Sequence, residues 1–256
     1  MKLSQVAVQL YTLRDFLKTP ADIAETLRKV AAIGYQAVQV SGMGPIAEEE
    51  LNALLEKNGL VCCATHENGD LIRAEPAKIV DRLRKLNCKY TAYPFPAGVD
   101  WTQPDHLDRL AADLDRAGAA LRAAGQVLTY HNHAIELIPF AGKTALDYLY
   151  AQTDPQNLLA EIDTYWIQYG GGNPAAWCRK LKGRLPLLHM KDYAFTTADK
   201  PVFAEIGKGN LNWPEIVAAA EASGCEWFIV EQDSCAGDPF DSIRLSFQYI
   251  KANLVG

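Results

Sequence analysis

Short apolar runs alternate with amphipathic segments eight times along the 256-residue chain, and this rhythm constrains the fold more than any other feature. The apolar runs have the length of strands and are bounded by turn residues; they span 3–10, 35–40, 60–65, 89–95, 126–131, 157–163, 185–190 and 225–232. The segments that follow them have helical periodicity; they span 21–33, 46–58, 76–86, 104–124, 143–152, 173–183, 212–223 and 239–254. Eight such units in about 250 residues predict a (β/α)8, or TIM, barrel.

A doubly wound open sheet is the structural alternative, because it also alternates strands and helices. Such a sheet usually carries a glycine-rich phosphate-binding turn after its first strand. The corresponding segment here, YTLRDFLKTP at 11–20, contains no glycine. Since no linker, low-complexity tract or charge run interrupts the chain, we expect residues 1–256 to form a single barrel domain.

Composition excludes several classes of partner. A formal net charge of −6 gives no general attraction to nucleic acid or to anionic membranes. The six cysteines form no C-x-x-C pair, which favours reduced thiols over disulfides or zinc. The first residues lack the pattern of a cleaved leader, and no apolar run reaches membrane-spanning length. We therefore expect a cytoplasmic protein, and the sequence leaves a homo-oligomer open.

Polar side chains gather where the predicted strands end, which is where (β/α)8 barrels hold their chemistry. Four of the five histidines lie there, and only His106 falls in a helix. The residues concerned are Gln9, Tyr11, Ser41, His66, Glu67, Tyr93, His131, Asn132, His133, Glu136, Glu161, Asp163, His189, Lys191, Asp192, Glu231 and Asp233. Strand alternation places Glu161 one layer deeper than Asp163, where it needs a partner such as Lys191 or a histidine.

Six segments together resemble the sugar phosphate isomerase/epimerase superfamily, the xylose isomerase-like TIM barrels. They are VQLYTLRD, YHNHAIE, LLAEIDTYW, LLHMKD, FAEIGKGNLNW and FIVEQD, in barrel order over essentially the whole chain. Members of this superfamily include ketose 3-epimerases, inosose dehydratases and, more distantly, endonuclease IV. Five histidines and an acidic balance argue against a nuclease with three zinc ions.

The resemblance implies one divalent metal ion bound by Glu136, Asp163, His189 and Glu231. Three carboxylates and an imidazole suit Mn²⁺ or Mg²⁺, with Co²⁺ and Zn²⁺ as competitors. Without a cation, three converging negative charges would repel one another. Each of the four also has a plain structural reading, such as a surface carboxylate for Glu136 or a turn-capping residue for Asp163.

The implied reaction acts on a carbohydrate through an enediolate, with Glu136 and Glu231 as the proton-transfer pair. Epimerisation, aldose–ketose isomerisation, and dehydration or elimination share this first step, so they stay open. A sugar-binding barrel without activity is a further alternative, although the implied ligand set is complete.

Five residues are expected to bind substrate: His66, His131, His133, Trp166 and Lys191. Strand alternation could point His131 and His133 away from the substrate, at the rim of the barrel. Lys191 could instead be a loop lysine paired with Asp192. Trp166 stands in DTYW, where ketose 3-epimerases and inosose dehydratases usually have D-T-G-H. It could stack on a sugar or simply cover the end of the barrel.

Overall fold

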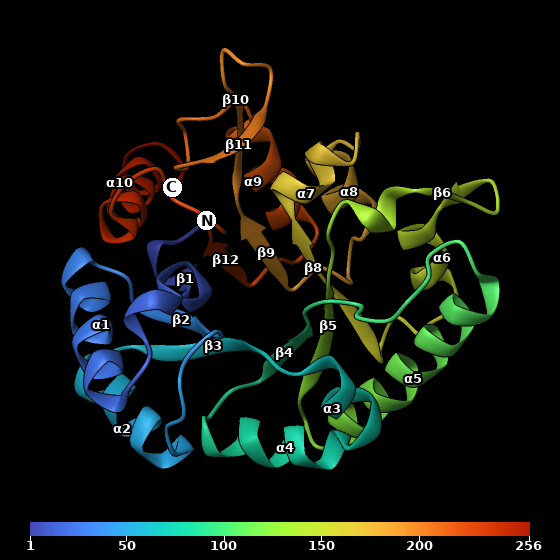
Figure 1. The fold of residues 1–256 in the computed structure, drawn as a ribbon, viewed down its shortest axis with the longest axis horizontal. Coiled ribbons are helices and arrows are strands. Elements are labelled where there is room, and N and C mark those ends of the chain that lie inside the picture. The colour runs from blue at the N-terminus through green and yellow to red at the C-terminus, as the bar shows by residue number, and fades with distance from the viewer.

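The computed structural model describes residues 1–256 and closes eight parallel strands into a barrel (Figure 1). The barrel strands are β1 (Val6–Gln9), β2 (Ala37–Val40), β3 (Val61–His66), β4 (Tyr90–Tyr93), β5 (Val127–His131), β8 (Leu158–Asp163), β9 (Leu187–Met190) and β12 (Trp227–Val230). They follow chain order around the ring, and β12 pairs with β1 to close it. The predicted (β/α)8 barrel is confirmed.

Eight helices follow the strands and surround the barrel (Figure 1). They are α1 (Pro20–Ile33), α2 (Glu48–Lys57), α4 (Pro76–Lys85), α5 (Pro104–Ala123), α6 (Ala145–Ala151), α8 (Pro174–Lys180), α9 (Trp213–Ala222) and α10 (Pro239–Asn253). Six of them have proline in the first turn, where a missing N–H costs nothing. The α1 helix also begins with a capping box between Thr19 and Asp22, which satisfies two free backbone donors.

Shorter elements lie in the connections. They are the 3-10 helices η1 (Leu3–Gln5), η2 (Leu10–Phe16) and η3 (Ile135–Leu137), the helices α3 (Gly69–Ala74) and α7 (Thr164–Tyr169), and the hairpins β6 (Pro139–Phe140) with β7 (Lys143–Thr144) and β10 (Asp192–Phe195) with β11 (Pro201–Ala204). All except η1 follow the carboxyl end of a barrel strand, so they build the mouth of the barrel. The η1 helix takes the first residues of the strand expected over 3–10, and β7 takes the first two residues of the helix expected over 143–152.

The barrel interior changes from apolar to polar toward that mouth. A small core of Ala7, Ala37, Cys63, Ala64, Tyr90, Leu187 and Ile229 fills the lower part, separately from the 59-residue core that joins strands to helices. Because side chains two residues apart on a strand share a face, the next inward layer consists of Gln9, Gln39, His189 and Glu231. The strands thus project their polar residues above an apolar floor. No helix combines the length and apolarity needed to cross a bilayer.

Candidate functional site

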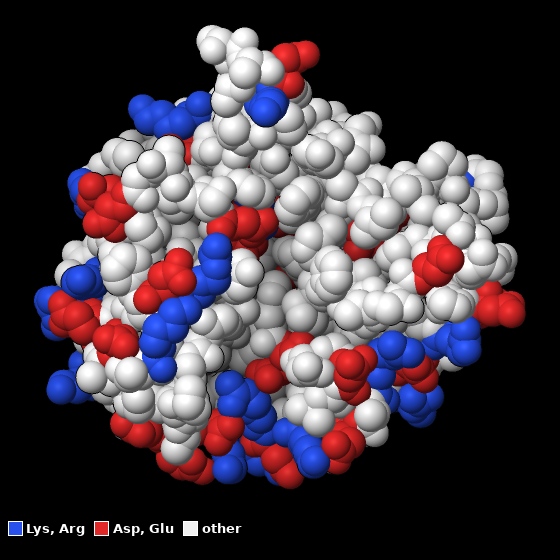
Figure 2. All heavy atoms as spheres, in the orientation of Figure 1, with Lys and Arg blue, Asp and Glu red and all other residues white.

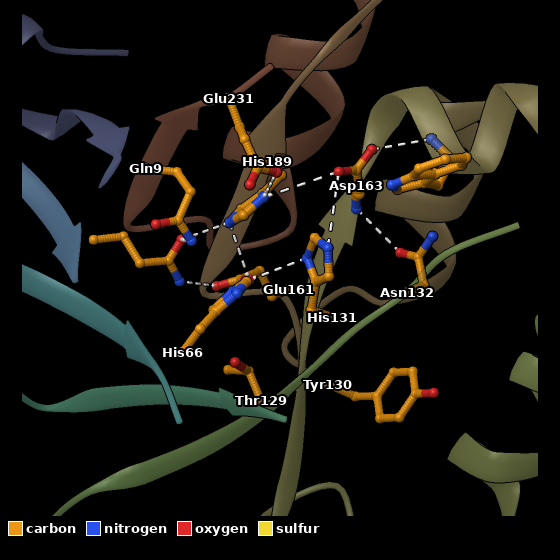
Figure 3. Close-up of polar contacts among 12 residues, drawn as sticks. Gln9, His66, Thr129, Tyr130, His131, Asn132, Glu161, Asp163, His189 and Glu231 are labelled. Carbon is orange, nitrogen blue, oxygen red and sulfur yellow. Dashed lines mark hydrogen bonds and ion pairs between the residues drawn. The ribbon is translucent and has the colours of Figure 1, made fainter. Parts of the chain in front are cut away.

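Glu161 on β8 is the centre of a buried polar cluster inside the barrel (Figure 3). Its Oε1 lies 2.5 Å from His66 Nε2, 3.0 Å from His189 Nε2 and 3.2 Å from His131 Nδ1. Its Oε2 accepts a 2.7 Å hydrogen bond from Gln39. Burial alone would raise the pKa of Glu161, but the neighbouring imidazoles of His189 and His66 hold that pKa well below its usual value. Glu161 is therefore an ionised anchor for three histidines.

A second group lies above Glu161 and contains Asp163, Glu231, His131 and His189, all buried. His189 Nδ1 lies 2.9 Å from Glu231 Oε2 and 3.9 Å from Asp163 Oδ2, and His131 Nε2 lies 4.0 Å from Asp163 Oδ2. Both imidazoles thus turn one nitrogen down to Glu161 and the other up to this group. A buried carboxylate behind each imidazole is the usual way to orient a histidine toward a metal ion.

The donor atoms of the upper group fit a divalent ion. One ligand atom from each of the four side chains lies within 4.8 Å of the others. Asp163 Oδ2 is buried and makes no hydrogen bond, while Oδ1 accepts one from the backbone N–H of Trp166. Burial raises the pKa of Asp163 to about 6, although the charge of Lys191 opposes this. A carboxylate oxygen without a hydrogen bond, beside two imidazoles and a second carboxylate, suits a borderline transition metal or Mg²⁺.

Lys191 lies inside this site rather than in solvent. Its side chain is 1% exposed, and its Nζ lies 2.7 Å from Glu231 Oε2, 2.8 Å from Asp233 Oδ1 and 3.0 Å from Asp163 Oδ2. Burial would lower the pKa of Lys191, but these three carboxylates raise it above its usual value. The alternative of a loop lysine paired with Asp192 is wrong, because Lys191 is buried and its partners are Asp163, Glu231 and Asp233.

Glu136 belongs to neither group, so the structure does not bring it together with the other three expected ligands. Strand β5 ends at His131, and Glu136 lies in η3 beyond it. Its Oε1 accepts a 2.9 Å hydrogen bond from the Tyr130 hydroxyl, and its Oε2 accepts one of 2.9 Å from the His133 backbone N–H. Tyr130 points away from the cluster (Figure 3). Burial raises the pKa of Glu136 to about 7.

A cavity of about 540 Å³ opens beside these groups at the mouth of the barrel. The face drawn in Figure 2 is hollowed near its centre, with acidic and basic side chains beside the hollow. The cavity is lined by Tyr11, Arg14, Ser41, His66, Glu67, Asn68, Pro94, Phe95, His131, His133, Lys191, Glu231 and Asp233. Most of these lining residues have polar or charged side chains.

Four of the five residues expected to bind substrate therefore line the cavity, and Trp166 does not. The Trp166 ring packs behind the wall, with its centroid 5.5 Å from that of His133, and Lys191 Nζ lies 5.6 Å from the Trp166 ring centre. Burial lowers the pKa of His133 to about 3, so its imidazole is neutral at pH 7. Trp166 thus backs two cavity residues.

Asp192 has a role that sequence reasoning missed. Its buried carboxylate accepts hydrogen bonds from the backbone N–H groups of Gly207, Gly209 and Leu211 and from Trp213 Nε1. The GKGNLNW segment is thereby fixed to the end of β9, while none of its residues lines the cavity. Repeated backbone donors around one aspartate could not be read from the motif, because the loop conformation determines them.

Sequence reasoning also missed Gln39 and the position of His131. Gln39 links Gln9 to His189, because its Oε1 lies 2.6 Å from His189 Nε2 and accepts a 2.9 Å hydrogen bond from Gln9. The available signal was strand alternation: Gln39 lies two residues after Ala37 on β2, on the inward face. His131 ends β5 and turns inward, whereas Asn132 turns to Asp163 and accepts a 3.0 Å hydrogen bond from its backbone N–H.

The chain belongs to the xylose isomerase-like TIM barrel family, whose model matches residues 27–253. An inosose dehydratase of Lacticaseibacillus casei is 26% identical over 167 residues, covering 59% of this chain and 55% of the relative. The alignment thus spans about half the length of that curated relative.

Two solved structures share the fold. A sugar phosphate isomerase/epimerase of Parabacteroides distasonis superposes with a TM-score of 0.82 at 21% identity, over 99% of this chain and 96% of that chain. A xylose isomerase-like TIM barrel protein of Mycobacterium smegmatis, solved in complex with magnesium, gives a TM-score of 0.75 at 14% identity, over 96% and 95%.

Proposed function

We propose that the protein is a divalent-metal-dependent isomerase or epimerase that acts on a sugar, keto-sugar or sugar phosphate. The observation that carries the proposal is the convergence of Asp163, Glu231, His131 and His189 at successive strand ends beside a polar cavity. The similarity to a sugar phosphate isomerase/epimerase and to an inosose dehydratase supports a carbohydrate substrate.

These four side chains would hold the ion, so His131 takes the place that the resemblance gave to Glu136. Two imidazoles and two carboxylates suit Mn²⁺ and Mg²⁺, with Co²⁺ and Zn²⁺ as competitors. When bound, the ion would stabilise the negative charge that develops on the carbonyl oxygen of the substrate.

Proton transfer in this proposal belongs to His133 and Glu231. Both line the cavity and follow different strands, β5 and β12, so they can reach a bound sugar from different sides. Either removes a proton from the carbon beside the carbonyl, which leaves an enediolate, and the other returns a proton taken up from solvent. His133 is neutral at pH 7, and the charges of Lys191 and His189 keep Glu231 ionised despite its burial.

The remaining cavity residues position the substrate. Lys191 offers an ammonium to an oxyanion, and His66 offers its imidazole to a hydroxyl from the β3 side. A sugar held by such groups presents its reacting carbon to the base in a fixed orientation, which removes much of the entropic barrier.

Dehydration of an inosose or keto-sugar is the second candidate, and the similarity to an inosose dehydratase favours it. It shares proton removal with epimerisation but ends with loss of a β-hydroxyl group as water. Product analysis separates the two: epimerisation conserves the mass of the substrate, and dehydration lowers it by one water.

The test is exchange of the substrate's α-hydrogen with deuterated water, because exchange reports the first step for every candidate product. Ketoses, their phosphates and inososes are assayed with Mn²⁺ or Mg²⁺ and after chelation. We expect exchange that requires the ion and falls at least about 100-fold in Glu231→Gln and His133→Asn, since a positioned acid or base contributes about 10²–10⁴-fold.

The helical His106, which does not line the cavity, provides the matched control. His106→Asn should exchange at the wild-type rate. Exchange that survives in both site variants with the ion still bound would overturn the assignment, and exchange unaffected by chelation would overturn metal dependence.

A further inference from the structure

Lys191 contacts the same two carboxylate oxygens that the proposed function assigns to a metal ion, namely Asp163 Oδ2 and Glu231 Oε2. We infer that Lys191 is an exchangeable internal cation: its ammonium competes with the ion for these oxygens and moves onto Asp233 when the ion binds. The inference rests on the proposed metal site, but it concerns how that site is filled rather than which reaction it performs.

The contacts of the ammonium are unequal, and this inequality identifies its second position. Its distances to Asp163, Glu231 and Asp233 lie between 2.7 and 3.0 Å, but only the contact with Asp233 has hydrogen-bond geometry. Asp233 is also the most accessible partner, with a side chain 29% exposed, whereas those of Asp163 and Glu231 are at most 5% exposed. Asp233 can therefore keep the ammonium after the two buried carboxylates turn to an ion.

Aromatic rings support the same position. Lys191 Nζ lies 5.6 Å from the centre of the Trp166 ring and 5.5 Å from that of Phe203. Both rings lie within the range in which an aromatic face attracts a cation. The two rings and Asp233 already contact the ammonium, so it can keep these contacts when the ion takes Asp163 and Glu231.

Electrostatics requires the exchange. An ammonium and a divalent ion that share two oxygens within about 3 Å would repel each other strongly in a buried site, where screening is weak. The movement has a consequence for substrate binding, because Lys191 and Asp233 both line the cavity. Ion binding thus turns a buried counter-ion into a cation that faces the substrate.

The experiment is a double-mutant cycle on Mn²⁺ affinity, measured by calorimetry on the full chain without substrate. Lys191→Met removes the competing charge and keeps a long side chain, so Mn²⁺ should bind at least about tenfold more tightly. Asp233→Asn removes the second position, so Mn²⁺ should bind more weakly. In the Lys191→Met background the Asp233→Asn effect should shrink at least about fivefold, because no ammonium remains to be displaced.

The cycle separates exchange from simple charge effects. If the two side chains act only through long-range electrostatics, Asp233→Asn changes the affinity by the same factor in both backgrounds, and this equality overturns the inference. Unchanged or weaker Mn²⁺ binding by Lys191→Met would also overturn it. Lys57→Met on the exposed face of α2 controls for loss of a lysine charge, and thermal unfolding confirms that each variant is folded.

The outcome is independent of the proposed reaction. Non-additive effects of Lys191→Met and Asp233→Asn on Mn²⁺ affinity, in a protein that shows no hydrogen–deuterium exchange of substrate, would support the displacement of Lys191 and overturn the proposed function. Metal-dependent hydrogen exchange with an additive cycle would support the proposed function and overturn Lys191 exchange.

Discussion

The free energy of unfolding of Glu136→Gln, compared with that of wild type, should increase as the pH rises. The side chain of Glu136 is fully buried, and its two oxygens accept hydrogen bonds from the Tyr130 hydroxyl and the His133 backbone. No cation pairs with it, so burial disfavours its charged form and raises its pKa. Glutamine keeps the shape and one acceptor oxygen but does not titrate.

The magnitude follows from the pKa shift. The pKa of Glu136 rises from an ordinary value of 4.5 to about 7, a shift of about 2.5 pH units. At ~1.36 kcal/mol per unit, this corresponds to ~3 kcal/mol. Because the folded-state pKa is the higher one, the contribution is fully present below about pH 4.5 and is lost as the pH rises through about 7. Between pH 5 and pH 8, wild type should lose ~2.5 kcal/mol relative to Glu136→Gln.

Urea unfolding of both proteins at pH 5, 6, 7 and 8 measures this difference, since each free energy of unfolding is extrapolated to water. The same substitution at the exposed Glu50 on α2 is the matched control. A difference between Glu136→Gln and wild type that stays constant from pH 5 to pH 8 would refute the reasoning. Mn²⁺ affinity is the second measurement: Glu136→Gln should retain it, and its loss would restore Glu136 as a ligand.

Four further substitutions test the site and its supports. His131→Ala should weaken Mn²⁺ binding at least about 100-fold. Glu161→Gln, which acts only through the imidazoles, should weaken it about 10–100-fold. If calorimetry shows the larger loss for Glu161→Gln, the ion lies instead in the group of Glu161, His66, His131 and His189. Gly209→Ala should lower the free energy of unfolding in urea by about 1–3 kcal/mol, because a Cβ there would collide with the buried Asp192 carboxylate. An unchanged free energy of unfolding would contradict the role of Asp192 in fixing the GKGNLNW segment. Trp166→Phe should leave KM within about twofold, since the ring does not line the cavity, and a tenfold rise would indicate direct substrate contact.

The barrel could be predicted because each strand and helix carries its own local signal. Apolar runs of strand length repeat eight times, and seven of the eight helices that follow them begin with proline or a capping box, so the repeats indicate the same fold. The β10–β11 hairpin carried no such signal. Its β10 strand is polar at Asp192 and exposed at Phe195, so it shows no clear alternation, and its stability depends on tertiary contacts with α7.

The candidate site could be predicted only as far as strand geometry extends. Asp163 ends β8, Glu231 directly follows β12 and His189 lies one residue before the end of β9, and the structure brings the three together. Glu136 lies five residues beyond the end of β5, in a 3-10 turn where the strand period no longer applies. His131, the last residue of β5, lies with Asp163, His189 and Glu231, where the resemblance implied Glu136.

The charges around the cavity explain why the site suits a divalent ion. Glu161, Asp163, Glu231 and Asp233 carry four carboxylates, and His189 and Lys191 oppose them. Burial would lower the pKa of His189, but Glu161 and Glu231 raise it to about 10. In the proposed site the ion would take the place of this proton on His189, and it would offset the negative charges of Asp163 and Glu231. Glu161 lies below and its oxygens are already engaged by imidazoles and Gln39, whereas Asp163 Oδ2 accepts no hydrogen bond and faces the Lys191 ammonium, which the ion would displace. The proposed ion would therefore lie in the upper group, at the cavity, where it can reach a substrate.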